Sequence, residues 1–215
     1  MSMNGFTITP TTALLVIDVQ NDFCPGGNLA VEEGDRVIPL INSIAGRFPL
    51  VVATKDWHPQ GHVSFASSHP GTEIQDTVRV GEIEQILWPD HCVQGTAGAE
   101  FHPDLDLRPI NLVLHKGTKQ GLDSYSAFFE NDKKTETGLR SYLQGLGFDR
   151  VVVCGLAADV CVYFTAADAR GIGFETAVVW DATRGVDIPA GSVDGARRDM
   201  EQRGAAIIES GDLTS

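Results

Sequence analysis

The sequence predicts an α/β protein: one doubly wound domain on a mainly parallel six-stranded sheet, with helices on both faces. Short, continuous runs of Val, Ile and Leu recur, which is typical of strands buried on both faces of a parallel sheet. Segments with helical periodicity lie between these runs, so strands and helices alternate. The six runs are 13–17, 50–53, 111–114, 151–154, 177–180 and 205–208.

Four helices are expected between or after these strands. The apolar stripes of the first two are Val37, Ile41, Ile44 and Phe48, and Leu139, Tyr142, Leu143 and Leu146. The pattern predicts a third helix over 160–170, with Asp159 as its N-cap and Gly171 ending it. Residues 189–203 predict the last helix.

Length and composition limit what the chain can be. With 215 residues, 42% of them hydrophobic, the chain can bury one sizeable core, so we expect a single domain over 1–215. The net charge of −13 argues against nucleic acid or an anionic membrane as a partner, because both attract clustered Lys and Arg. No apolar run approaches the roughly 20 residues of a membrane span.

We expect a cytoplasmic protein. Residues 1–6 lack the charged and apolar regions of a signal peptide. The four cysteines are too few for a disulfide scaffold in a chain of this size, which favours reduced thiols. The sequence leaves open whether copies of the chain associate into a homo-oligomer.

Residues 56–109 break the alternation of strands and helices. This stretch holds five of the six histidines and two tryptophans, but no long periodic segment. A loop of this length in a compact domain is usually functional or disordered, and its aromatic side chains argue against disorder. We therefore expect an excursion that folds over the strand ends, forms one wall of the site and carries a metal site.

Reactive side chains follow four of the predicted strands. Asp18 ends the first run, 56–58 follows the second, Lys116 follows the third, and Cys161 lies shortly after the fourth. The carboxyl ends of parallel strands share one edge of a sheet, where open α/β folds bind their ligands. We therefore expect these side chains to meet in one cleft.

Cys161 is the strongest candidate for a nucleophile. A cysteine in an apolar helix is more often a packed core residue. Here it falls in the first turn after Asp159, where the helix dipole favours a thiolate and free backbone N–H groups can stabilise an oxyanion. Cys154 lies inside a strand run and is interpreted as structural, while Cys24 and Cys92 stay undecided.

Asp18 and Lys116 are placed to assist this thiol. A carboxylate at a strand end is often only a cap or turn former, and a lysine there is usually a solvated charge. If both approach Cys161, however, the ammonium lowers the thiol pKa and the carboxylate accepts its proton.

Asp56 and His58 form a candidate pair of metal ligands. They flank Trp57, so in an extended segment both side chains point the same way. An Asp with two His is a reasonable ligand set for zinc, iron or manganese, with positions left open for water or substrate. The pattern alone leaves four candidates for the second histidine, namely His62, His69, His91 and His102.

Taken together, these segments resemble the nicotinamidases, within the isochorismatase-like family of cysteine hydrolases. The resemblance runs from Ala13 to about Ile208, nearly the whole chain. A set of motifs in this order is highly specific. The segments that carry it are LVIDVQNDF (15–23), KDWHP (55–59), WPDHCVQGT (88–96), HKG (115–117) and GLAADVCV (155–162).

The resemblance implies a metal-containing amidase that converts nicotinamide to nicotinate and ammonia in NAD salvage, with pyrazinamide as a side substrate. Its catalytic triad would be Asp18, Lys116 and Cys161, and the reaction would pass through a thioester on Cys161. Its metal ligands would be Asp56, His58 and His91, with zinc as the expected ion and iron or manganese as alternatives. The fourth metal position stays open between His62 and Ser64.

Further site features follow from the same resemblance. It implies a cis peptide between Leu156 and Ala157, which aims the amides of Ala157 and Cys161 at the oxyanion. It also implies that Phe23, Trp88 and Tyr125 wall the pyridine ring. The alternative is a related cysteine hydrolase acting on another small amide; such relatives typically lack the Asp-x-His pair. A catalytically silent binding module is the rival from another class.

Overall fold

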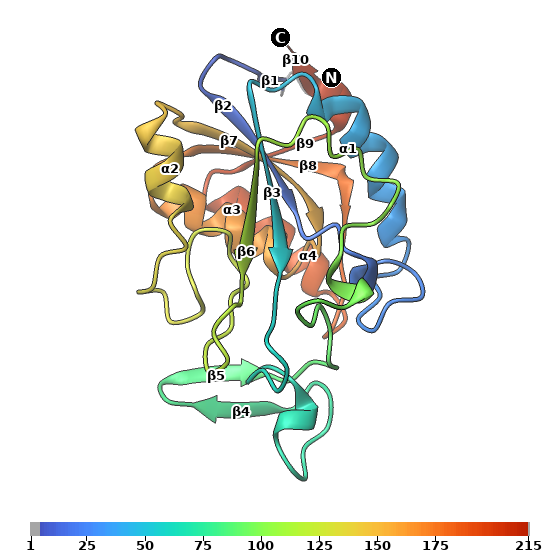
Figure 1. Ribbon diagram of the computed structural model, residues 1–215. Helices are drawn as coiled ribbons and strands as arrows, with labels where there is room; N and C mark the ends of the chain where they lie inside the picture. Colours follow the sequence, from blue (N-terminus) through green and yellow to red (C-terminus); the bar gives the residue numbers. More distant parts are fainter. Residues whose placement is uncertain (1–4, 215) are drawn as a thin grey trace.

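Six parallel strands form the central sheet of the computed structural model, which describes residues 5–214 (Figure 1). The strand order is β6-β3-β2-β7-β8-β9, and every neighbouring pair is parallel. The predicted doubly wound α/β fold is confirmed. The strands are β2 (Thr12–Ile17), β3 (Leu50–Asp56), β6 (Leu112–Lys116), β7 (Arg150–Leu156), β8 (Glu175–Arg184) and β9 (Ala206–Ile208).

Helices cover both faces of this sheet (Figure 1). Helix α1 (Val37–Ala45) packs on the face that carries Leu14 and Val16. The other three helices pack on the face that carries Leu15 and Ile17, because successive side chains of a strand point to opposite faces. These helices are α2 (Leu139–Gly145), α3 (Cys161–Gly171) and α4 (Ser192–Gln202).

The predicted end of α3 at Gly171 is confirmed, but the predicted N-cap is wrong. Val160, not Asp159, occupies the N-cap position, and no side chain caps the helix there. The Asp159 carboxylate instead accepts hydrogen bonds from the backbone N–H groups of Val186 and Asp187, which lie on another segment. Gly171 is the last helical residue, and the left-handed conformation belongs to Gly173 with φ +98°.

The excursion between β3 and β6 contains a hairpin that the sequence reasoning did not predict. Strands β4 (Thr77–Val80) and β5 (Ile83–Ile86) pair antiparallel around Gly81, whose φ of +61° suits glycine. Figure 1 shows the hairpin beyond the carboxyl ends of the central strands. Two 3₁₀ turns complete the excursion, η3 (Ala66–Ser68) and η4 (Ala97–Ala99).

The two ends of the described chain lie together. Strand β1 (Phe6–Thr7) pairs in parallel with β10 (Leu213–Thr214). The remaining 3₁₀ turns are η1 (Asn21–Phe23), η2 (Gly34–Arg36) and η5 (Ser210–Asp212). The expectation about a signal peptide concerned residues 1–6, of which 1–4 lie outside the described residues.

Two further expectations concern the chain as a whole. Within residues 5–214, no helix has both the length and the apolar character that crossing a membrane requires. All four cysteines are free and buried.

The peptide between Leu156 and Ala157 is cis, as the resemblance implied.

Replacing Cys154 by Ala tests its structural interpretation. Cys154 lies in β7, is fully buried in the core, and its Sγ lies 3.7 Å from the carbonyl oxygen of Leu15. The small cavity left by alanine should lower the free energy of unfolding by about 1 kcal/mol, measured by urea denaturation. An unchanged free energy of unfolding would mean that this side chain contributes nothing to the core.

Candidate active site

Four central strands deliver the predicted reactive side chains to one edge of the sheet. Asp18 follows β2, Asp56 ends β3 and Lys116 ends β6, while Cys161 begins α3 just after β7. Asp56 and Lys116 are directly paired in the register of β3 and β6. The convergence predicted from the strand ends is therefore present.

The ammonium group of Lys116 lies at the centre of this cluster. Its Nζ is 2.8 Å from Asp18 Oδ2 and 3.4 Å from Cys161 Sγ, and it also contacts Asp56 Oδ1. It donates a further hydrogen bond of 3.0 Å to the carbonyl oxygen of Ser124. Burial disfavours the charged form, but the two carboxylates outweigh it and raise the pKa of Lys116 well above its usual value. The side chain is therefore a buried cation.

The surroundings of Cys161 favour the protonated form of its thiol. Burial raises the pKa of its thiol well above the usual value, although Lys116 lowers it as the sequence reasoning expected. The nearby carboxylates of Asp18 and Asp56 raise the pKa further. The effect of burial on the thiol pKa is thus larger than the opposing effect of the ammonium, so a nearby base would assist nucleophilic attack.

Asp18 is placed to be that base. Its Oδ1 accepts a hydrogen bond of 2.6 Å from the hydroxyl of Thr54, and its own backbone N–H donates to the same hydroxyl at 3.2 Å. Its Oδ2 is buried and lies 2.8 Å from the ammonium of Lys116, on the side of the cluster that also holds Cys161. Burial raises the pKa of Asp18, which makes the carboxylate a better proton acceptor.

The turn before α3 leaves two backbone N–H groups free. Within residues 5–214, neither the amide of Ala157 nor that of Cys161 has a hydrogen-bond acceptor. The carbonyl oxygen of Ala157 accepts from Val160 and from Val162, each at 3.1 Å, which holds the turn in shape. Two unpaired donors beside a thiol are what an oxyanion needs.

A second cluster shares Asp56 with the first. Its Oδ2 lies 3.8 Å from Nε2 of His58 and 3.9 Å from Nε2 of His91. The Nδ1 atoms donate to carbonyl oxygens, of Gly117 at 2.9 Å and of Pro89 at 2.8 Å, so the free electron pairs lie on the two Nε2 atoms. Burial lowers the pKa of both histidines to about 4, which keeps them neutral. One carboxylate and two neutral imidazoles fit a divalent cation.

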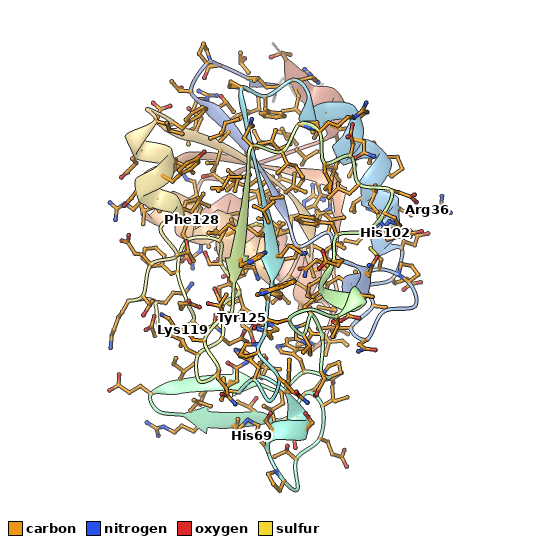
Figure 2. The ribbon with its side chains drawn as sticks, viewed as in Figure 1. Arg36, His69, His102, Lys119, Tyr125 and Phe128 are labelled. Atoms are coloured by element: carbon orange, nitrogen blue, oxygen red, sulfur yellow. The ribbon has the colours of Figure 1, made fainter. Side chains whose placement is uncertain are left out.

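The other candidate histidines form hydrogen bonds with other protein groups. His62 accepts at Nδ1 from the hydroxyl of Ser64 at 2.7 Å and donates from Nε2 to the carbonyl oxygen of Leu122 at 3.3 Å. Direct coordination by His62 would break one of these bonds. His69 Nε2 donates to the carbonyl oxygen of Val63 at 2.8 Å, and Figure 2 shows this histidine beside the hairpin. His102, which lies apart from the hairpin in Figure 2, accepts at Nδ1 from the backbone N–H of Asp104 at 3.3 Å. Of the four candidates, His91 is the one that completes the pair formed by Asp56 and His58.

A pocket of about 400 Å³, part of it open to solvent, joins the two clusters. Polar groups line one part of it, namely Asp56, His91, Asp123 and Cys161. The rest is formed by Phe23, Leu29, Val31, Trp88, Tyr125, Ala157, Val160 and Val186. The three predicted ring-wall residues, Phe23, Trp88 and Tyr125, are therefore all in the pocket.

Several residues that hydrogen-bond to pocket residues were not predicted from the sequence. Asp123 is buried at the pocket, and its Oδ2 accepts from Nε2 of Gln85 at 2.9 Å. The same Nε2 lies 3.2 Å from the hydroxyl of Tyr125, which also accepts from Nε1 of Trp88 at 3.1 Å. The polar residues around Asp123 could have indicated from the sequence that it lies at the site. Nothing in the sequence distinguishes Thr54 from an ordinary strand threonine.

The parallel sheet and the buried thiol, carboxylate and ammonium at its edge define an α/β protein with the arrangement of a cysteine hydrolase. The family model for the isochorismatase domain matches residues 12–212, so the chain belongs to the isochorismatase family. A nicotinamidase of Acinetobacter baylyi is 48% identical over 198 residues, which covers 92% of each chain.

Solved structures agree with this family. The nicotinamidase and pyrazinamidase of Acinetobacter baumanii superimposes with a TM-score of 0.93 at 50% identity, covering 95% of this chain and 98% of that one. The pyrazinamidase of Pyrococcus horikoshii in complex with zinc has a TM-score of 0.75 at 37% identity, covering 93% and 99%.

Replacing Thr54 by Val or by Ser tests whether the hydroxyl holds Asp18. Valine has nearly the shape of threonine but leaves Asp18 Oδ1 buried without its donor, which should lower the free energy of unfolding by about 1–3 kcal/mol. Serine keeps the hydroxyl and loses one methyl group, for a cost of about 0.8 kcal/mol. Denaturant titration of the two variants gives the comparison. Equal free energies of unfolding for the valine and serine variants would show that this hydrogen bond does not stabilise the fold.

Proposed function

We propose that this chain hydrolyses nicotinamide to nicotinate and ammonia, with Cys161 as nucleophile and a divalent cation as cofactor. One observation carries the proposal. Lys116 Nζ lies 2.8 Å from Asp18 and 3.4 Å from Cys161 at a pocket that also contains Asp56 and His91. The nicotinamidase of Acinetobacter baylyi, similar over nearly the full length of the chain, supports the same activity. Such an enzyme returns nicotinamide to NAD synthesis.

In the first half of the reaction, Asp18 takes the proton from Cys161. The sulfur then attacks the carboxamide carbon: an S–C bond forms, and the π electrons of the carbonyl move onto its oxygen. The free amides of Ala157 and Cys161 are the proposed donors to this oxyanion. Asp18 next gives its proton to the nitrogen, the C–N bond breaks, and ammonia leaves a thioester on Cys161.

In the second half, water replaces ammonia. Asp18 removes a proton from the water, which attacks the thioester carbon. The C–S bond breaks, and Cys161 recovers its proton from Asp18. The acid leaves as nicotinate, with its remaining proton passing to solvent. Lys116 stays cationic throughout and stabilises whichever partner carries the negative charge.

Substrate placement depends on the other part of the pocket. Phe23, Trp88 and Tyr125 are proposed to hold the pyridine ring, and the Trp88–Tyr125 hydrogen bond of 3.1 Å fixes two of them to each other. A divalent cation held by Asp56, His58 and His91 would supply a Lewis acid for the pyridine nitrogen. Zinc is the proposed ion, with iron and manganese as alternatives; the zinc complex of the Pyrococcus horikoshii pyrazinamidase supports this choice. We also propose that pyrazinamide, with a ring of the same shape, is a substrate.

Two broader expectations belong to the same proposal. The chain is proposed to act as one domain over 1–215, with the excursion over 56–109 carrying the metal site. Its four free, buried thiols support a cytoplasmic location, where thiols stay reduced.

Replacing Cys161 by Ala tests the nucleophile. The variant should fold normally and release no measurable ammonia from nicotinamide, because the covalent step has no substitute. Ammonia release by the wild-type protein is the positive control, and the Cys154→Ala variant is the matched cysteine control, expected to keep its turnover. Near-normal activity of Cys161→Ala would overturn the mechanism. Wild-type protein that cleaves another small amide but not nicotinamide would favour the related-hydrolase alternative.

Removing the metal, or replacing His58 by Ala, tests how the ring is recognised. Benzamide lacks the pyridine nitrogen, so the metal position would go unfilled, and such unpaired polar partners can cost factors of up to about 10⁴ in kcat/KM. The intact protein should therefore prefer nicotinamide strongly. His58→Ala should lose bound metal by elemental analysis, raise KM for nicotinamide and reduce this preference. Equal turnover of both amides by the metal-loaded wild-type protein would contradict the proposed recognition of the ring nitrogen by the metal.

A further inference from the structure

Asp159 ties the turn that carries Cys161 to the segment that follows β8. Its Oδ1 accepts from the backbone N–H of Val186 at 2.9 Å. Its Oδ2 accepts from the N–H of Asp187 at 2.9 Å and from the hydroxyl of Ser192 at 2.5 Å. Next to it, the N–H of Ala158 donates to the carbonyl oxygen of Arg184 at 2.7 Å. Two consecutive residues of the turn are thus bound to one segment, 184–192.

The turn before α3 and the segment 184–192, which Asp159 joins, both contribute to the site. The turn carries the free amides of Ala157 and Cys161, and the segment carries Val186, which lines the pocket. The packing between them is close. A Cβ added at Gly185 would lie 2.8 Å from Asp159 Oδ1 and 2.3 Å from a methyl group of Val193. The carboxylate is therefore enclosed between the two parts of the chain.

We propose that Asp159 is a positioning residue for the reaction, holding the two amides at the oxyanion relative to the pocket wall at Val186. Asp159 does not itself line the pocket, so its effect must pass through the turn. Donors to an oxyanion act chiefly in the tetrahedral state, and small displacements weaken them strongly. The inference rests on the proposed function, since it concerns the same thiol and the same amides.

The segment offers a matched control at Asp187. One oxygen of Asp187, Oδ1, accepts from the N–H groups of Gly191 at 2.8 Å and Val193 at 3.2 Å, within the segment itself. Asparagine at 187 keeps that accepting oxygen and tolerates the left-handed φ of +51°. Asparagine at 159, in contrast, replaces one of two accepting oxygens by an NH₂ group. The two variants remove the same charge but only one loosens the turn.

The test measures kcat and KM for nicotinamide and the inhibition constant of pyridine-3-carbaldehyde. This aldehyde reports on the tetrahedral state, because the Cys161 sulfur adds to its carbonyl carbon and the thiol proton ends on the oxygen. Asp159→Ala should lower kcat by about 10-fold or more, with KM changed by less than about threefold. Its affinity for the aldehyde should fall in parallel with kcat/KM. Asp159→Asn should show a smaller loss of the same kind, and Asp187→Asn should match the wild type.

The outcomes separate this inference from the proposed function. A wild-type protein that releases no ammonia from nicotinamide would overturn the proposed function. If the wild type is active but Asp159→Ala keeps the kcat of Asp187→Asn, or loses aldehyde affinity only as much as KM rises, Asp159 is merely structural and the inference fails. If Asp159→Ala does not fold, Asp159→Asn decides the question by the same split between kcat and KM.

Discussion

The buried ion cluster around Lys116 is the constraint on which the rest of the structure depends. One ammonium lies against two carboxylates, Asp18 and Asp56, with almost no access to water. Buried charges of this kind are tolerated only when each keeps its partners, and loss of one partner leaves an uncompensated charge. Because the three side chains come from the ends of β2, β3 and β6, the sheet must place those ends correctly for the cluster to exist. Folding and reactivity therefore depend on the same contacts.

Asp56 makes the two halves of the site one unit. Its Oδ1 contacts the ammonium of Lys116, while its Oδ2 faces Nε2 of His58 and of His91. A cation held by the two histidines would compete with Lys116 for the negative charge of Asp56 and would thereby change the electrostatic field at Cys161. Nicotinamide suits this arrangement, because its ring nitrogen and its carboxamide stand at separate positions of one rigid ring. In the proposed mechanism, recognition of the ring and attack on the amide are thus linked through the carboxylate of Asp56.

The sequence predicted the sheet and the edge at which Asp18, Lys116 and Cys161 meet, because buried strands read as continuous apolar runs and their ends share an edge. It could not choose His91 without the family resemblance, since the choice depends on how the excursion folds back over the strand ends. The hairpin β4–β5 was missed because its strands are short and half exposed. The capping role of Asp159 was wrong for a different reason. Donors on a distant segment, 186–192, compete for its carboxylate, and periodicity along the chain carries no signal of them.

The raised pKa of the Cys161 thiol favours a base inside the cluster for the proposed reaction. Lys116 offsets one of the two carboxylate charges, and loss of the thiol proton to solvent would add a further negative charge to this buried cluster. Transfer of the thiol proton to Asp18 changes no net charge, because the carboxylate is neutralised as the thiolate forms. Burial raises the pKa of both groups, so its effect on the transfer of the proton from one to the other largely cancels. In the proposed mechanism, a thiol whose pKa is raised by burial can therefore still pass its proton to Asp18 when the sulfur attacks the substrate.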